Sequence, residues 1–536
     1  MDSVKGQEYD LLVIGGGITG AGIALDAASR GLKTVLVEKN DFASGTSSKS
    51  TKLIHGGLRY LKQFEIALVR EVGRERATVH RLIPNLVTAE KMLLPLIKDG
   101  NFGKLMTSIG LMVYDVLAGV EKADQRKMLT IEKTLDKEPL LSPDNIEGGG
   151  IYAEYRTDDA RLTIEIIKTA VKHGAHCLNY VQADDLIYEE GRVAGIRATD
   201  FILDEELEIK AKSTISAAGP WVDELRTKNQ SMSNKHLHLT KGVHIVIPHE
   251  RFPVKQALYF DFPDKRMVFA IPRGKITYIG TTDTDYSGDK EDIRTNLEDV
   301  EYLVNGTNHA FPNLKLEVKD VESSWAGVRP LIHEEGKSAS EISRKDEIFE
   351  SETGLLSIAG GKLTGYRKMS EKVLDRLFKR LNKEDGTEIV KCKTAHIDLD
   401  GGAFEDAKAV KKYRKAVRKK LEELGLSKYY AFYLVSNYGK VADQLIEGMN
   451  AFDGKDPEID LIRSELKYCL ENEQVYRLED FFIRRTGRLY FDIHSINHTF
   501  DAILSDFQAH FQWTDEDCEK HKSAMEAEIR KVSVFE

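Results

Sequence analysis

An apolar run that ends in a glycine-rich turn sets the fold class of this chain: Leu11-Leu12-Val13-Ile14-Gly15-Gly16-Gly17-Ile18-Thr19-Gly20. A stretch with helical character follows to Arg30, and a second apolar run, Lys33-Thr34-Val35-Leu36-Val37, ends on Glu38. An apolar strand that breaks into glycines is typical of a buried parallel strand feeding a phosphate-binding turn. The order strand, helix, strand therefore predicts the first unit of a parallel α/β sheet.

Gly15, Gly17 and Gly20 have the spacing G-x-G-x-x-G of dinucleotide-binding turns. In such turns the first glycine permits the tight bend, the second lets backbone approach a pyrophosphate, and the third lets helix pack close to strand. The helix N-terminus offers N–H groups and partial positive charge to the pyrophosphate. Glu38 ends the second strand where a carboxylate can accept hydrogen bonds from ribose hydroxyls. An ordinary glycine-rich turn would not explain Glu38, so we predict a dinucleotide site.

The composition is that of a large globular protein. The 536 residues suggest about three domains, and the hydrophobic fraction of 41% supports sizeable cores. The net charge of −10 gives no reason to expect nucleic acid as the main partner. The four cysteines stand far apart, which predicts a reducing interior and neither a disulfide framework nor a zinc site. Residues 1–10 lack the layout of a signal peptide.

Shifts of pattern along the chain predict its domains. We expect a nucleotide- and substrate-binding region over 1–385, a linker over 386–400 and an α-helical C-terminal domain over 401–536. In the first region the predicted nucleotide-binding segments are 8–75, 150–230 and 350–385, and the predicted substrate-binding segments are 76–149 and 231–349.

Local periodicity predicts the elements inside these segments. Residues 62–140 are expected to be helical, with Leu93–Ile97 as an apolar interruption, and residues 150–215 are expected to be strands. Alternating and aromatic runs between 235 and 350 predict an antiparallel sheet. The run Leu105–Val120 is too interrupted to span a membrane; we expect a buried helix, with a membrane-surface helix as the alternative.

Several cations stand in glycine-rich, non-helical settings. The loop Ser44–Ser48 offers hydroxyl and N–H groups to phosphates, and His55-Gly56-Gly57 then lets backbone pass close to a flat group. Arg59 follows, and Arg329, Arg344 and Lys362 occupy similar settings later in the chain. An acidic chain that concentrates positive charge in this way is predicted to bind a small dianion, such as a phosphate ester.

Two histidines are candidate proton acceptors. His55 lies beside the glycine pair, and His244 lies on the predicted strand Lys241–Ile245. A histidine of near-neutral pKa can take the hydroxyl proton when an alcohol is oxidised. No spacing typical of a metal site occurs, so no metal is predicted.

These motifs resemble the FAD-dependent glycerol-3-phosphate dehydrogenases over about residues 8–375. The run from Ile14 to Asp26 resembles the family's first signature, and Lys52–Leu61 resembles its hallmark loop. The run Gly360–Arg367 resembles the second signature. Further along, this sequence departs from the signature at Ser370, where alanine is usual. Because serine is also small, this departure concerns packing rather than chemistry. The resemblance continues more loosely through the C-terminal domain, including Arg484-Arg485-Thr486, to which no role is assigned.

The resemblance implies a fold and a reaction. The fold would be α/β: a glutathione-reductase-like FAD-binding fold joined to an antiparallel-sheet substrate domain, as in D-amino-acid oxidases, and to the helical C-terminal domain. The reaction would be oxidation of sn-glycerol 3-phosphate to dihydroxyacetone phosphate, with hydride transfer from C2 to flavin N5. Electrons would pass to a membrane quinone, which implies a cytoplasmic enzyme, peripheral on the inner face of the plasma membrane.

The resemblance also implies which residues form the site. Arg329, His244 and His55 would serve catalysis, and His244 is preferred as proton acceptor to Arg329, because arginine is almost always protonated. The substrate would be bound by Arg59, Tyr60, Arg329, Arg344 and Lys362. FAD would be bound by Gly15, Gly17, Ile18, Thr19, Gly20, Glu38, Lys39, Thr46, Ser47, Ser48, His55, Gly56, Gly57, Leu58, Val181, Ala218, Gly219, Trp221, Gly361, Lys362, Leu363 and Thr364.

Three alternatives stay open at this point. The enzyme could be a glycerol-3-phosphate oxidase that uses oxygen, or an amino-acid oxidase of the same superfamily, although several cations suit a dianion better than one carboxylate. A more distant alternative is an FAD-bearing RNA-modifying or RNA-binding protein that contacts RNA through Lys411–Lys420, against which the net charge argues. Otherwise this lysine run is a solvated helix face. The C-terminal domain could also serve docking or a homodimer.

Overall fold

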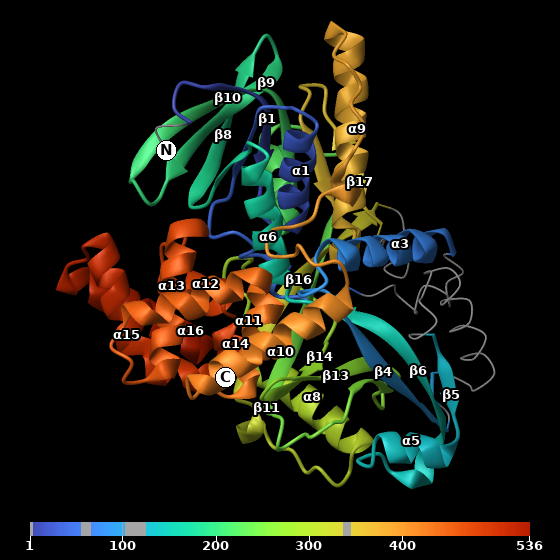
Figure 1. Cartoon of the computed structure of the whole chain (residues 1–536). Helices are drawn as coiled ribbons and strands as arrows, with labels where there is room; N and C mark the ends of the chain where they lie inside the picture. The colour runs from blue at the N-terminus through green and yellow to red at the C-terminus, as the bar shows by residue number, and fades with distance from the viewer. Residues whose placement is uncertain (1–3, 55–65, 99, 102–124, 336–344) are drawn as a thin grey trace.

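The computed structural model describes the chain apart from residues 1–3, 55–65, 99, 102–124 and 336–344. Over the described residues the strands form two sheets, and helices pack around them (Figure 1). In Figure 1 the first sheet lies at the top, the second lies below it, and the C-terminal helices are coloured orange to red.

The first sheet has eight strands around a parallel centre. β1 (Glu8–Ile14) pairs in parallel with β2 (Thr34–Val37) on one side and with β10 (Glu205–Ser216) on the other. The remaining strands are β7 (His176–Leu178) and β18 (Leu356–Ala359), which are parallel, and β8 (Val181–Glu189), β9 (Arg192–Asp200) and β17 (Glu347–Glu350), which are antiparallel. Leu11–Ile14 are buried, as expected for an apolar central strand.

Helices bury one face of this sheet. α1 (Ile18–Ser29) packs against α6 (Asp159–Lys172) and α9 (Tyr366–Asp385), and their side chains share one hydrophobic cluster with β1. α3 (Ile66–Leu82) and α7 (Val222–Lys228) complete the helices of this region. The predicted strand–turn–helix order around Gly15–Gly20 is therefore confirmed.

The second sheet has ten strands and is antiparallel except for the pair β12–β4. Its two longest strands, β11 (Lys235–Pro248) and β16 (Ser323–Glu334), pair along twelve positions. The others are β3 (Leu53–Ile54), β4 (Thr88–Ile97), β5 (Lys127–Leu129), β6 (Ile146–Arg156), β12 (Ala257–Asp261), β13 (Met267–Arg273), β14 (Ile276–Gly280) and β15 (Thr284–Asp285). α5 (Ile131–Lys137) and α8 (Leu297–Ala310) pack on this region.

The C-terminal region is helical, as predicted. Its helices are α10 (Ala407–Glu423), α11 (Lys428–Tyr438), α12 (Ala442–Gly448), α13 (Pro457–Asn472), α14 (Arg488–Phe491), α15 (Ile493–Phe511) and α16 (Asp515–Ser533), with a π-helical turn at Asp480–Arg485. Tyr278 and Trp325 of the second sheet share one hydrophobic cluster with Phe491 of this region. The C-terminal helices therefore pack on the second sheet through a common core.

Two expectations about elements are only partly right, since α3 and α5 lie within 62–140, and β7–β9 with most of β10 lie within 150–215. Residues 62–140 are not helical throughout, because β4 and β5 lie within them, and Leu93–Ile97 is the end of β4 rather than an interruption. The charged first half of β4 hides its strand character, and its partner β6 begins about fifty residues later. Residues 150–215 contain α6, whose first turn is capped by Asp158. β6 belongs to the second sheet, so the segment predicted to bind nucleotide from residue 150 starts on a strand of the other sheet.

The outcome for the fold class is clear. An α/β unit with a parallel centre, a mainly antiparallel second sheet and a helical C-terminal region are all present, as predicted. The predicted apolar stretch Leu105–Val120 lies outside the described residues. Among the described helices, none is both long and apolar enough to cross a bilayer.

Candidate cofactor and substrate site

The glycine turn after β1 brings backbone segments into very close contact. Gly15 has a φ of +112°, and a Cβ there would lie 2.6 Å from the carbonyl oxygen of Ala217. A Cβ on Gly20 would lie 1.8 Å from the carbonyl oxygen of Gly15. Only glycine fits at these two positions, because real Cβ atoms do not approach backbone oxygen so closely. Bare backbone therefore lines this end of the cavity.

Glu38 is held in place by backbone donors at the end of β2. Its Oε2 accepts a hydrogen bond of 2.7 Å from the N–H of Gly16, and its Oε1 accepts one of 3.0 Å from the N–H of Asn40. Burial raises the pKa of Glu38, although the two N–H donors act in the opposite direction. The carboxyl group is thus fixed beside the glycine turn, as a ribose-binding acid requires.

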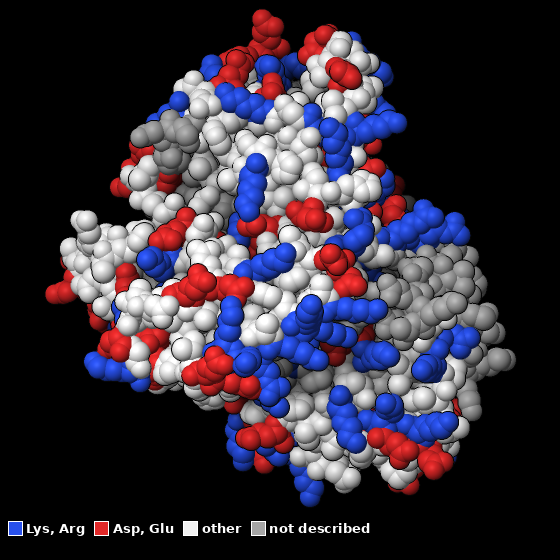
Figure 2. All heavy atoms as spheres, in the orientation of Figure 1, with Lys and Arg blue, Asp and Glu red and all other residues white. Residues whose placement is uncertain are grey.

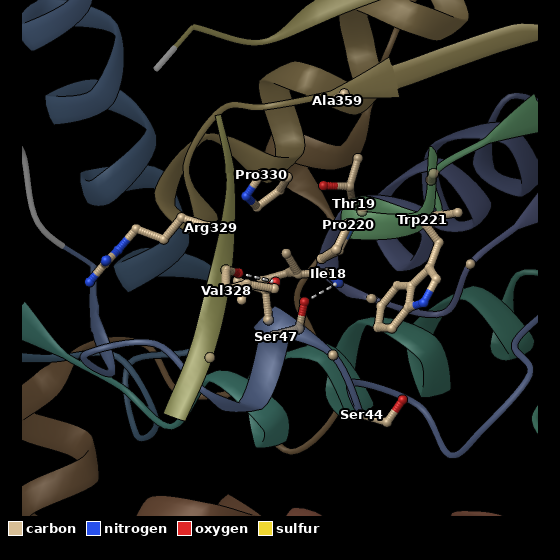
Figure 3. Close-up of a pocket in the computed structure, with 18 of the residues that line it drawn as sticks. Ile18, Thr19, Ser44, Ser47, Pro220, Trp221, Val328, Arg329, Pro330 and Ala359 are labelled. Atoms are coloured by element: carbon tan, nitrogen blue, oxygen red, sulfur yellow. Dashed lines mark hydrogen bonds between the residues drawn. The ribbon is translucent and has the colours of Figure 1, made fainter. Parts of the chain in front are cut away.

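The loop Ser44–Ser48 joins the two sheets at the cavity. Ser47 Oγ accepts a hydrogen bond of 2.9 Å from the N–H of Ile18 at the start of α1, and Thr46 Oγ1 donates one of 2.8 Å to the carbonyl of Val328 on β16 (Figure 3). Asp159 anchors the chain just beyond this loop, since it accepts from the N–H and Oγ of Ser50 and pairs with Lys52 at 2.6 Å.

One cavity of about 580 Å³ connects these features to the second sheet. Such a volume is in the range of cofactor and ligand sites. The predicted cofactor residues that line it are Gly15, Gly17, Ile18, Thr19, Glu38, Lys39, Thr46, Ser47, Val181, Ala218, Gly219, Trp221, Gly361, Lys362, Leu363 and Thr364. Of the predicted cofactor residues that the structure describes, two do not line it: Gly20 acts through packing, and Ser48 points its hydroxyl to the carbonyl of Gly45.

Arg329 marks the other end of the cavity. In Figure 3 its side chain extends from β16 away from Ser47 and Trp221. Its guanidinium pairs with Asp283 at 3.0 Å and donates to Thr281 Oγ1 at 3.0 Å, which fixes its direction. Lys362 also lines the cavity, so the structure brings together two of the predicted substrate-binding cations.

His244 lies on β11 and lines the same cavity. Its ring stacks on Trp325 with centroids 4.7 Å apart, and its Nε2 lies 3.0 Å from Thr51 Oγ1. Its buried Nδ1 has no hydrogen-bond partner among the described residues. Burial lowers the pKa of His244 well below 6.5, and the charges of Arg329 and Lys52 lower it further. The imidazole is therefore neutral at physiological pH and able to accept a proton.

Seven predicted site residues lie outside the described residues: His55, Gly56, Gly57, Leu58, Arg59, Tyr60 and Arg344. Their roles stay predictions.

Sequence reasoning missed Lys49, Thr51 and Asp159. Lys49 lines the cavity and makes no ion pair with a described residue, and burial and then the charge of Lys531 lower its pKa to about 8. Its place directly after the loop Ser44–Ser48 was the available signal. Thr51 and Asp159 gave none, because their partners lie more than a hundred residues away.

Known proteins resemble this chain over nearly its whole length. Residues 10–367 match the FAD dependent oxidoreductase family, and residues 392–518 match the C-terminal domain of alpha-glycerophosphate oxidase. The aerobic glycerol-3-phosphate dehydrogenase of Bacillus subtilis (strain 168) is 50% identical over 518 residues, which are 96% of this chain and 93% of that protein. A solved glycerol-3-phosphate dehydrogenase from Bacillus halodurans complexed with FAD is 42% identical with a TM-score of 0.84, covering 100% of this chain and 97% of that one.

The matches define this chain as an FAD-dependent oxidoreductase, whose cofactor is FAD. The described residues fit that cofactor, since a cradle that a Cβ would fill at Gly15, an acid at the end of β2 and a helix N-terminus meet in one cavity. Within this class, the chain belongs to the family of aerobic glycerol-3-phosphate dehydrogenases.

Proposed function

We propose that this enzyme oxidises sn-glycerol 3-phosphate to dihydroxyacetone phosphate and passes the electrons to a membrane quinone. The observation that carries the proposal is a single cavity with two chemically different ends. One part of its lining is backbone and Glu38, and another part holds Arg329 beside the neutral His244, with Lys362 also among the lining residues. A phosphate ester with an oxidisable hydroxyl group is the kind of substrate that suits the second end.

Arg329 and Lys362 would hold the phosphate dianion. Arg329 is already oriented by Asp283 and Thr281, so little side-chain freedom is lost when a substrate binds. Arg59 and Arg344 are proposed to complete this set. When bound, FAD supplies the hydride acceptor for C2 of the substrate.

His244 is the proposed acceptor of the hydroxyl proton. Its ring is neutral, and its Nδ1 lacks a partner among the described residues. Arg329 is unsuited to this role because a guanidinium paired with a carboxylate stays protonated. Arg329 would instead stabilise the alkoxide that forms as the proton leaves.

Contact with an anionic membrane is proposed on the basis of α10. Figure 2 shows Lys and Arg side chains gathered over the part of the surface that α10 occupies in Figure 1. Lys408, Lys411, Lys412, Lys415 and Lys419 are exposed there, and none pairs with a described acid. Clustered lysines on an amphipathic helix suit anionic headgroups. Flotation with anionic vesicles, compared with a variant carrying glutamine at these five positions, tests the contact.

The decisive experiment is an anaerobic titration. The purified yellow protein is mixed with sn-glycerol 3-phosphate, and bleaching of the flavin absorbance is recorded. Bleaching by this compound, but not by glycerol or D-amino acids, is the expected result. A flavin that stays oxidised would overturn the substrate assignment. Reoxidation is then compared with a soluble quinone and with oxygen, and faster reoxidation by oxygen would favour an oxidase.

A further inference from the structure

Arg485 is fully buried and Arg484 is largely buried in the C-terminal region, although both lie outside the cavity that holds the chemistry. They end the π-helical turn Asp480–Arg485, between α13 and α14. Short π-helical segments are uncommon and frequently accompany function. Burying two guanidinium groups is costly unless each is fully paired, so their partners show what this turn is built to hold.

Their shared partner is Asp41, three residues after Glu38. Arg485 donates to both carboxylate oxygens of Asp41, at 2.7 and 2.8 Å, and Arg484 donates to it as well. The side chains of Asp41 and Arg485 are fully buried. Burial opposes ionisation of Asp41, but the charges of Arg485 and Arg484 outweigh it and hold its pKa below the usual range. The result is a bidentate, charge-assisted clamp between distant parts of the chain.

A second contact ties the segment Asn179–Val181, which borders the cavity, to the same π-helical turn. Tyr180 donates from its hydroxyl to Asp480 at 2.5 Å, and its N–H donates to the carbonyl of Asn40 at 2.9 Å. The next residue, Val181, lines the cavity and donates to the carbonyl of Glu38 at 2.8 Å. Asn179, which precedes Tyr180, donates to Asp41 at 2.9 Å and so connects the Tyr180 contact with the arginine–Asp41 clamp. The turn therefore holds two segments that border the FAD site.

The clamp reaches the glycine turn through the backbone. The N–H of Ser44 donates to the carbonyl of Asp41 at 3.1 Å, and the N–H of Ala43 donates to the carbonyl of Gly16 at 3.1 Å. Gly16 in turn donates to Glu38. A shift of Asp41 would thus move the loop that begins at Ser44, whose Ser47 hydroxyl holds the first N–H of α1.

We propose that Arg485, with Arg484 and Asp41, is a positioning device through which the C-terminal region sets the affinity for FAD. The three residues are positioning residues, since none lines the cavity. The proposal rests on FAD as the cofactor and is independent of the substrate assignment. It assigns a role to Arg484 and Arg485, which contact Asp41 across 443 and 444 residues of sequence.

Arg161→Lys is the matched control for Arg485→Lys. Arg161 is equally buried and also forms an ion pair that joins the α/β region to the C-terminal helices, through Glu473 at 2.7 Å. Neither Arg161 nor Glu473 lines the cavity, and neither bonds to the loop Glu38–Ser48 through its side chain. Glu473 also accepts from Arg485 through its carbonyl at 2.7 Å, so Arg161→Lys disturbs the same neighbourhood and leaves the bonds between Arg485 and Asp41 in place. Both substitutions keep a positive charge and remove the bidentate geometry, so a general loss of stability should affect them alike.

The test uses the full-length protein and measures the dissociation constant for FAD by flavin fluorescence, together with melting of the apo and FAD-saturated forms. Arg485→Lys and Asp41→Asn are expected to raise the constant about tenfold or more, equivalent to about 1.4 kcal/mol, while Arg161→Lys leaves it nearly unchanged. The gap in melting temperature between saturated and apo protein should shrink only in the first two.

An unchanged dissociation constant in Arg485→Lys and Asp41→Asn, with both forms destabilised equally, would overturn the proposal. If Asp41→Asn fails to fold, Arg485→Lys alone decides, because it retains the charge. At saturating FAD both variants should still bleach with sn-glycerol 3-phosphate to the same extent as the parent. Loss of bleaching in the parent would refute the substrate assignment and leave the clamp untouched.

Discussion

The two ends of the cavity are built on opposite principles. The glycine turn and Glu38 lie within 24 residues of one another. The turn acts through bare backbone, and the carboxyl group of Glu38 is held by backbone N–H donors, so the geometry of this end is local. The proposed substrate end brings together His244 on β11 and Arg329 on β16, and it acts through side chains. Damage to the first end should remove the cofactor, whereas damage to the second should leave a flavoprotein that no longer turns over.

The largest effect is expected at Gly20. Gly20→Ala places a Cβ 1.8 Å from the carbonyl oxygen of Gly15, so the turn must open and the protein should be isolated without flavin. Its affinity for FAD should fall by more than about a hundredfold, near 2.7 kcal/mol. The measurement is the ratio of flavin to protein absorbance. Gly365→Ala is the control, because nothing lies within 4 Å of that Cβ; a yellow Gly20→Ala protein would contradict the turn assignment.

Arg329→Ala should give the opposite phenotype. FAD stays bound, because Arg329 extends away from Ser47 and Trp221, while kcat/KM falls about 10²–10³-fold, the loss typical for an electrostatic group at the reacting centre. Steady-state kinetics and the flavin spectrum are compared with Arg251→Ala, which removes an exposed arginine that pairs with Asp320. Retained turnover would take Arg329 out of the substrate end.

The difference between the ends also explains what sequence alone could predict. The strand–turn–helix around Gly15 and the acid at the end of β2 are neighbours in sequence, so spacing was enough to predict them. The contact of His244 with Thr51 spans 193 residues, and that of Arg485 with Asp41 spans 444. No periodicity encodes such a pairing. β4 was missed for the same reason, because its strand character depends on pairing with β6.

His244→Asn should lower kcat by roughly a hundredfold, the lower range for loss of a general base, and leave FAD bound. It should also change the pH dependence of stability. The native pKa of His244 is depressed, so between that value and about 6.5 the unfolded chain binds the proton and the native chain does not. The contribution of neutral His244 to the free energy of unfolding is therefore complete above about pH 6.5 and is lost as the pH falls below that value.

Denaturant unfolding at pH 5.5 and 7.5 measures this second effect: the loss of stability on acidification should be smaller in His244→Asn than in the parent. His249→Asn is the control for the kinetics, since His249 also contacts a threonine hydroxyl, at 3.0 Å from Thr277, but does not line the cavity. Equal kcat in the two variants would remove His244 as the proton acceptor.

The smallest effect is expected at Lys49, which borders both this cavity and a second one of about 230 Å³ beside Arg484. Its pKa is lowered to about 8, so burial of the charged ammonium group lowers the free energy of unfolding. This loss of stability is complete below about pH 8 and disappears above about pH 10.4, where Lys49 is neutral in both the native and the unfolded chain. Lys49→Met should therefore stabilise the apo protein at pH 7 and less at pH 9.5. FAD binding should weaken by roughly threefold, because the cofactor's phosphates lose a nearby cation. Denaturant unfolding of the apo protein measures the effect on stability, and FAD titration measures the effect on affinity. A Lys49→Met variant that binds FAD more tightly would contradict a contribution of Lys49 to cofactor binding.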